Sequence, residues 1–178
     1  MSDLLKKLKL KDSFETQIPI EANVFRKKLS SIVDKRDTSI FSNISDIFSS
    51  SKNDYRGSVS KDSFKLKRKK KLFDMNMNSA VAEGIFKQEA DQLIISTNIN
   101  AFQGQMKVIY IILPFFYILF LTMFLIGTKE SDNMHFVFVP FIIFHACLMM
   151  GIPYMMMRTS VGKMKKELER EFYFLTRN

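Results

Sequence analysis

The chain has 178 residues, a formal net charge of +9 and a hydrophobic fraction of 47%. Its positive charge favours an acidic partner: anionic lipid, nucleic acid or an acidic protein surface. The single cysteine, Cys147, excludes an intramolecular disulfide, and with only two histidines the chain lacks the Cys/His cluster of a metal site. The sequence therefore predicts no metal and no cofactor.

The first part of the chain predicts two helices preceded by a strand. A basic N-terminal segment, residues 1–13, has four leucines between its lysines, and is either a short helix lying on lipid or a solvated terminus. Residues 14–20 alternate apolar and polar side chains up to Pro19, which favours an edge strand. Apolar residues at helical spacing predict amphipathic helices over residues 21–33 and 38–49.

From residue 55 onward, apolar side chains recur at every second position. Strands are expected at residues 55–59 and around Phe64, and a hairpin is expected at residues 81–87 and 92–99. These four strands predict an antiparallel meander. With the two helices, they predict a cytoplasmic α+β domain over residues 14–103.

The stretch KLKRKKKLF, residues 65–73, holds six cationic side chains. The two-residue period of a strand divides them between two faces, with Lys65, Lys67, Lys69 and Lys71 on one and Arg68 and Lys70 on the other. We expect all six to bind anionic lipid or a partner protein, because few residues separate the last strand from the first apolar run. A solvated edge strand is the alternative. Nucleic acid is disfavoured because no RNA-binding strand, zinc-finger or helix-turn-helix motif accompanies the patch.

Two uncharged apolar runs decide the class of protein. Residues 108–126 and 134–157 are each long enough to cross the hydrocarbon core of a bilayer, which takes about 20 apolar residues. They predict a transmembrane hairpin over residues 104–157, with a short polar loop at residues 127–133. A buried core hairpin is the alternative, but a soluble domain of this size has little surface with which to cover both runs.

The distribution of positive charge predicts the orientation of this hairpin. Residues 1–106 hold 19 Lys and Arg, residues 158–178 hold six, and the connecting loop holds one. The positive-inside rule therefore places both termini in the cytoplasm and the loop outside. Lys107 and Arg158 are expected to mark the inner membrane boundary. Near them, Tyr110 and Tyr154 are expected to lie at the interface.

His145 lies near the middle of the second run, where an ionisable group indicates a proton or ligand role by default. The preferred interpretation is a neutral imidazole that packs by a hydrogen bond to Thr122 or Tyr117 of the facing helix. After this run, residues 158–178 carry apolar side chains at helical steps. They predict a separate amphipathic helix that covers the apolar face of the meander, or that binds a partner.

The motifs YRGSVSKDSFKLKR (residues 55–68) and EGIF (residues 83–86), followed by a membrane hairpin, resemble a family of small bacterial membrane proteins. In that family, a cytoplasmic β-rich domain precedes a two-helix transmembrane hairpin. The resemblance covers residues 55–178, implies a multi-pass protein of the bacterial inner membrane, and implies no activity. Nucleotide-binding, metalloprotease and serine-hydrolase motifs are absent, so no enzyme and no catalytic residue is predicted.

Together these observations predict a non-enzymatic two-span inner-membrane protein. We expect an accessory, regulatory or scaffold subunit of a larger membrane complex, with its basic domain docked on anionic lipid and other membrane-protein subunits as partners. One alternative is a self-assembling oligomeric scaffold or channel-like protein. Another is a membrane-tethered enzyme or lipid-binding protein.

Overall fold

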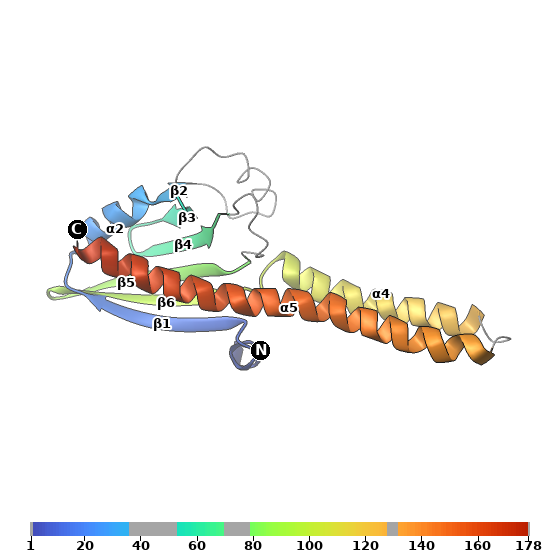
Figure 1. Cartoon of the computed structure of the whole chain (residues 1–178). Helices are drawn as coiled ribbons and strands as arrows, with labels where there is room; N and C mark the ends of the chain where they lie inside the picture. Colours follow the sequence, from blue (N-terminus) through green and yellow to red (C-terminus); the bar gives the residue numbers. More distant parts are fainter. Residues whose placement is uncertain (1, 36–52, 70–78, 128–131, 178) are drawn as a thin grey trace. The chain divides into compact units, whose positions relative to one another are not determined.

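A computed structural model describes residues 2–35, 53–69, 79–127 and 132–177 of the chain (Figure 1). It divides into two compact units. Met1–Phe102 together with Met157–Asn178 form the first, which we call the α/β unit; Gln103–Met156 form the second, the helix pair. The α/β unit thus includes both terminal segments, which the sequence analysis treated as separate from the cytoplasmic domain.

The α/β unit contains a six-stranded sheet in the order β1-β6-β5-β4-β3-β2. Its strands are β1 (Lys11–Ile18), β2 (Val33–Lys35), β3 (Tyr55–Val59), β4 (Ser63–Arg68), β5 (Val81–Glu89) and β6 (Gln92–Asn100). All neighbours are antiparallel except β2 and β3, which are parallel. The predicted four-strand meander corresponds to β3–β6, and the strand predicted at residues 14–20 is the edge strand β1. Strand β2 was not predicted, because three residues are too few to establish an alternating pattern.

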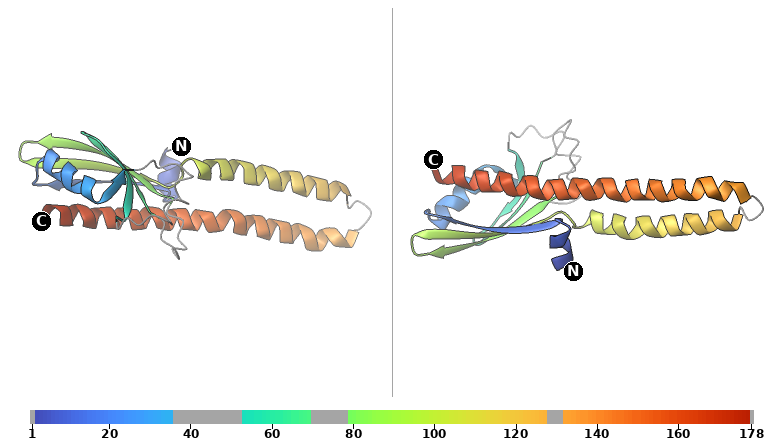
Figure 2. Two further views of the ribbon diagram at one scale, coloured as in Figure 1. Left: turned by 90° about the horizontal axis from the view of Figure 1, so that it is seen from above. Right: turned by 60° about the horizontal axis from the view of Figure 1, so that its bottom comes forward.

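Two helices cover one face of this sheet: α2 (Ala22–Ser31) and the last part of α5 (Asp132–Arg177) (Figure 2). Phe172 of α5 is fully buried, with ring centroids 6.2 Å from Phe14, 5.4 Å from Phe25 and 5.8 Å from Phe64. Phe86 closes the cluster at 5.7 Å from Phe25. The C-terminal segment therefore covers the apolar face of the sheet, as the sequence analysis expected. The second predicted helix, residues 38–49, lies outside the described residues.

Two glycines make this packing feasible. A Cβ atom on Gly84 would lie 2.2 Å from Cε1 of Phe64, so the phenylalanine ring occupies the space above that glycine. Gly57 has φ +150°, and a Cβ there would lie 1.8 Å from the carbonyl oxygen of Lys65. Both glycines belong to the motifs that carry the family resemblance, so those motifs have a packing explanation.

The chain begins with the short helix α1 (Ser2–Lys7). Leu5 and Leu10 are buried in the α/β unit, whereas Leu4 and Leu8 are exposed. Of the two alternatives for this segment, a short helix is present, and a solvated terminus does not agree with the burial of Leu5 and Leu10.

The helix pair consists of α4 (Gln105–Gly127) and α5 up to Met156. Ring and hydrogen-bond contacts join Tyr110 to Met150, Tyr117 to His145, and Phe124 to Phe138, in the descending order of two antiparallel helices. The two units divide between Met156 and Met157, next to the predicted end of the second span, but the terminal segment is not a separate helix, since α5 runs unbroken from Asp132 to Arg177. A change of hydropathy at residue 158 needs no break in backbone hydrogen bonding, and no proline follows Pro153.

Candidate functional site

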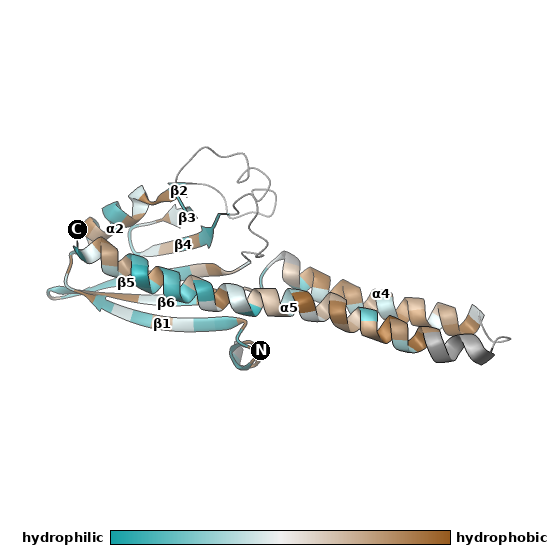
Figure 3. Cartoon of the chain, in the orientation of Figure 1, coloured by the Kyte–Doolittle hydropathy of each residue, from teal (hydrophilic) through white to brown (hydrophobic). Residues whose placement is uncertain are grey.

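The apolar surface of the helix pair is its most prominent feature. The segments Met106–Gly127 and Phe138–Arg177 are long and apolar enough to cross a membrane, and their most apolar stretches are only 0% and 6% buried. Figure 3 shows hydrophobic residues along α4, whereas α5 changes from hydrophobic to largely hydrophilic toward its C-terminus. A core helix of a soluble protein is mostly buried, so the alternative interpretation of these runs as a core hairpin has no support in the described residues.

Individual side chains of α4 illustrate this exposure. Ile111 is 72% exposed and Phe115 is 68% exposed, values that leave most of each side chain outside any contact within the chain. Continuous apolar surface of this kind marks contact with a membrane or another protein.

Within the pair, polar groups are joined to one another. The Tyr110 hydroxyl donates to the carbonyl oxygen of Met150 at 2.6 Å. The Tyr117 hydroxyl lies 2.6 Å from Nδ1 of His145. Thr122, the other partner considered for His145, instead donates to the carbonyl oxygen of Ile118 in its own helix at 2.7 Å. Internal hydrogen bonds lower the cost of placing these groups in an apolar medium.

The residues predicted to mark the membrane boundary lie near the ends of the apolar stretches. Lys107 and Arg158 are exposed, and Tyr110 and Tyr154 are partly exposed. Because the hydroxyl of Tyr110 bonds within the pair, it does not need a lipid headgroup as its partner. The boundary role of all four residues stays a prediction.

The basic stretch is less available than the sequence suggested. Lys65 lies 2.8 Å from Glu83, its cross-strand neighbour on β5, and Arg68 lies 2.8 Å from Glu167 of α5. Lys67 is in register with Val81 of β5. Lys70 and Lys71 lie outside the described residues. Some of the four cations that lie in the described residues therefore form ion pairs with carboxylates of the same unit.

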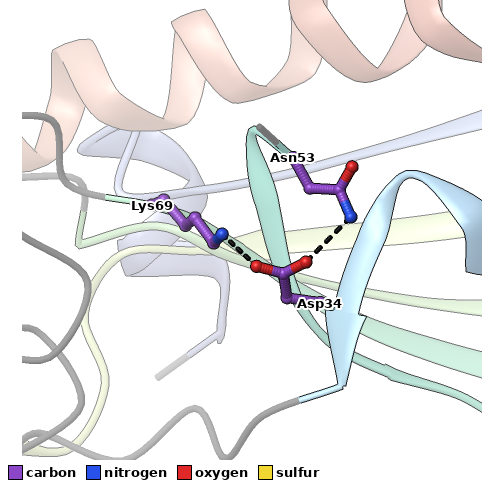
Figure 4. Close-up of polar contacts among 3 residues, drawn as sticks. All are labelled: Asp34, Asn53 and Lys69. Carbon is purple, nitrogen blue, oxygen red and sulfur yellow. Dashed lines mark hydrogen bonds and ion pairs between the residues drawn. The ribbon is translucent and has the colours of Figure 1, made fainter. Parts of the chain in front are cut away.

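Lys69 differs most from expectation. It is 5% exposed, its ammonium group forms an ion pair with Asp34, and its backbone N–H donates to the carbonyl oxygen of Asp54 (Figure 4). The Asn53 amide donates to the other Asp34 oxygen at 2.8 Å. The prediction that this lysine faces solvent or lipid is wrong, because β4 ends at Arg68 and the next residue turns toward β2. Since β2 was not predicted, no sequence signal marked Asp34.

Two further residues of β3 were missed. Arg56 is fully buried and in register with Asp34 on the neighbouring strand. Tyr55 is also buried, and burial raises its pKa well above the ordinary value of 10.0, with a further contribution from the Glu167 carboxylate. Their place in the motif YRG was noted, but alternation alone does not reveal buried polar side chains.

Among the described residues, no group of three or more His, Cys, Asp or Glu side chains could hold a metal ion. Comparison of the chain with protein-family models, curated proteins and solved structures gave no match. Inferences about function therefore depend on the physical properties of the two units.

Proposed function

We propose that the chain is an integral membrane protein whose helix pair spans a bilayer twice. The observation that supports this is the exposure of the apolar stretches, which are 0% and 6% buried. In water, that surface drives aggregation, whereas lipid acyl chains solvate it at no such cost. The internal hydrogen bonds of Tyr110 and Tyr117 fit the same environment, because an unpaired polar group in hydrocarbon is costly.

In this proposal, the α/β unit and both termini lie on the cytoplasmic side of a bacterial inner membrane, in accordance with the excess of Lys and Arg outside the loop. The whole protein is proposed to be an accessory, regulatory or scaffold subunit that binds other membrane proteins and catalyses no reaction. Support comes from the absence of a catalytic motif in the sequence.

Extraction of membranes at alkaline pH tests the location. The protein is expected to stay with the membranes, and a double substitution, Phe115→Arg with Ile118→Arg, is expected to release a large fraction. Each buried arginine costs about 2.5–3.5 kcal/mol near the centre of a spanning helix. Ile85→Arg is the matched control, since Ile85 is 63% exposed on the sheet. Recovery of the unsubstituted chain in the soluble fraction would overturn the proposal.

Purification from native membranes in a mild detergent, followed by mass spectrometry, tests the accessory role. Unrelated membrane proteins in fixed proportion to the chain are the expected result. Purification of the chain alone would contradict an accessory role while leaving the membrane location intact.

A self-associating helix pair is the second candidate, and the exposure of His145 favours it. A polar side chain exposed on a membrane-spanning helix points to a protein neighbour rather than lipid. Cys147, two residues away, is exposed as well and offers a native cross-linking probe. A disulfide-linked dimer formed in membranes under mild oxidation, absent from Cys147→Ser, would favour self-association; its absence would favour the accessory role.

A further inference from the structure

The structure distinguishes two groups of cations in the α/β unit. Lys65, Arg68 and Lys69 contact carboxylates, as described above. By contrast, Lys6, Lys7 and Lys9 of the N-terminal segment are exposed, and no carboxylate of the described residues forms an ion pair with them. Residues 2–11 contain one acidic side chain, at position 3, against four lysines. The N-terminal segment therefore presents positive charge that no ion pair within the described residues neutralises.

Backbone geometry holds this segment in a defined conformation. The N–H of Lys9 donates to the carbonyl of Lys6, and the N–H of Leu10 donates to the carbonyl of Leu5, each at 2.9 Å. These two bonds, with Lys9 at φ 56°, form the Schellman motif that ends a helix. Its characteristic apolar contact joins the residues at the positions of Leu5 and Leu10, and both are buried.

The segment is also joined to the sheet. The N–H of Ala101 donates to the carbonyl of Leu10 at 3.0 Å, and Lys11 pairs with Asn100 of β6. Leu10 and the start of β1 are therefore fixed to the C-terminal end of β6.

While Leu5 and Leu10 point into the unit, two other leucines do not. Leu4 is 59% exposed and Leu8 is 38% exposed. Residues four apart lie on the same side of a helix, so these two leucines form one small apolar surface between the lysines. Neither can turn inward while the Schellman motif and the two buried leucines are in place.

Chain connectivity relates this surface to the membrane. Only five residues, 102–106, lie between Ala101 and Lys107, which precedes the first apolar run. If that run enters the bilayer, the chain alone keeps the end of β6 within about 20 Å of the membrane boundary, because a residue spans at most about 3.3–3.6 Å.

We propose that the N-terminal segment, residues 4–9, is a membrane-surface anchor. Leu4 and Leu8 insert at the level of the headgroups, and Lys6, Lys7 and Lys9 bind anionic lipid. This inference depends on the proposed membrane location, and it adds a lipid-binding site at the N-terminus, where the lysines, unlike Lys65 and Lys69, form no ion pair with a carboxylate of the described residues. Apolar side chains flanked by lysines are typical of segments that lie in the interface of anionic membranes.

The chain contains no tryptophan, so a single substitution provides a specific fluorescent probe. Full-length Leu4→Trp and Leu8→Trp are reconstituted into vesicles of phosphatidylcholine with phosphatidylglycerol. Both are expected to emit at shorter wavelength than Ile85→Trp and to be quenched by lipids brominated near the headgroup. Ile85 is a matched control, since it is 63% exposed and lies on the sheet.

The lysines are tested by a triple substitution, Lys6, Lys7 and Lys9 to Gln, in the Leu8→Trp background. Quenching is expected to fall to the level found in vesicles of phosphatidylcholine alone. Raising the salt concentration from 0.1 M to 1 M is also expected to lower the quenching of Leu8→Trp with all three lysines present. The reason is that screening shortens the Debye length from about 10 Å to about 3 Å.

Retention of the protein in vesicles tests the membrane location, whereas the emission and quenching of the tryptophans test the N-terminal anchor. If the protein stays in the vesicles at alkaline pH while both tryptophans emit and quench like Ile85→Trp, the anchor is wrong and the membrane location stands. If the unsubstituted protein leaves the vesicles, the membrane location is wrong and the anchor fails with it. Equal quenching with and without anionic lipid would overturn the role of the lysines.

Discussion

Phenylalanine shows how differently the two units are built. In the α/β unit, Phe172 is fully buried and touches three other rings, whereas Phe115 of the helix pair is 68% exposed. The same side chain thus makes its contacts within the chain in one unit, and is left largely exposed in the other. The α/β unit has an apolar core of its own, whereas the most apolar stretches of the helix pair are only 0% and 6% buried.

Charges follow the same division. The α/β unit contains an ion pair between Lys69 and Asp34 that is largely shielded from water, along with exposed pairs such as Lys65 with Glu83. In the described part of the helix pair, polar side chains form hydrogen bonds, for instance between Tyr117 and His145. Such bonds suit the proposed membrane location, because a polar group in lipid is less costly when it has a hydrogen-bond partner.

Substitution of Phe172 and of Phe115 is expected to show the largest difference between the two units. Phe172→Ala is expected to destabilise the α/β unit by about 3–5 kcal/mol, the usual cost of removing a buried ring. Phe115→Ala is expected to leave the stability of that unit unchanged. Thermal unfolding of the full chain in detergent, followed by near-ultraviolet circular dichroism, checks both. Equal losses for the two variants would contradict the assignment of one ring to a core and the other to lipid.

A second pair of substitutions compares buried with exposed charge. Lys69→Met is expected to cost about 3 kcal/mol, because it leaves the Asp34 carboxylate with one cation fewer in a shielded site. Lys65→Met is expected to cost at most about 1 kcal/mol, since its pair with Glu83 is exposed. Denaturant titration measures both differences. A larger loss for Lys65→Met would show that the ion pair in Figure 4 does not stabilise the unit.

The pKa of Tyr55 predicts a pH dependence of the α/β unit. Burial raises this pKa above 10.0, so above about pH 10 the unfolded tyrosine ionises while the folded one stays protonated. The unfolded state then binds fewer protons, and the free energy of unfolding falls by about 1.4 kcal/mol per pH unit until the folded pKa is reached. Tyr55→Phe should remove this part of the slope. An identical alkaline slope in both proteins would show that Tyr55 is not the group responsible.

In the helix pair, removal of a hydrogen bond is expected to change stability by less than the substitutions in the α/β unit core. His145→Leu removes the hydrogen bond to Tyr117 and is expected to lower stability in detergent by about 0.5–2 kcal/mol, while membrane insertion stays intact because leucine is more apolar. Unfolding in mixed micelles measures this change. Loss of a biological activity at unchanged stability would instead assign His145 a proton or ligand role.

Much of this division could be predicted from sequence periodicity. A period of two at Phe64 and Leu66 predicts a strand with one buried face, and both side chains are buried on the face covered by α5. Two uncharged runs of the required length predict helices that are apolar on all sides, and the exposed side chains of α4 agree with this.

Other features depend on contacts between distant residues, which periodicity does not encode. Lys69 belongs to a run of cations, yet the turn after β4 and the short strand β2 bring it to Asp34. Lys9 occupies a left-handed position that glycine usually fills, so a Schellman motif could not be predicted there. As a result, Lys65 and Lys69 of the basic stretch contact carboxylates, whereas Lys6, Lys7 and Lys9 of the N-terminal segment are exposed.

Labelling of cysteines from the two sides of the membrane tests most directly that the helix pair spans it. In a Cys147→Ser background, Ser131→Cys in the loop between the apolar runs and Ser51→Cys, which precedes β3 in the chain, are treated with a membrane-impermeant thiol reagent. We expect intact cells to label Ser131→Cys alone, and permeabilised cells to label both. Labelling of both positions only after permeabilisation, or of both equally in intact cells, would contradict a helix pair that crosses the membrane.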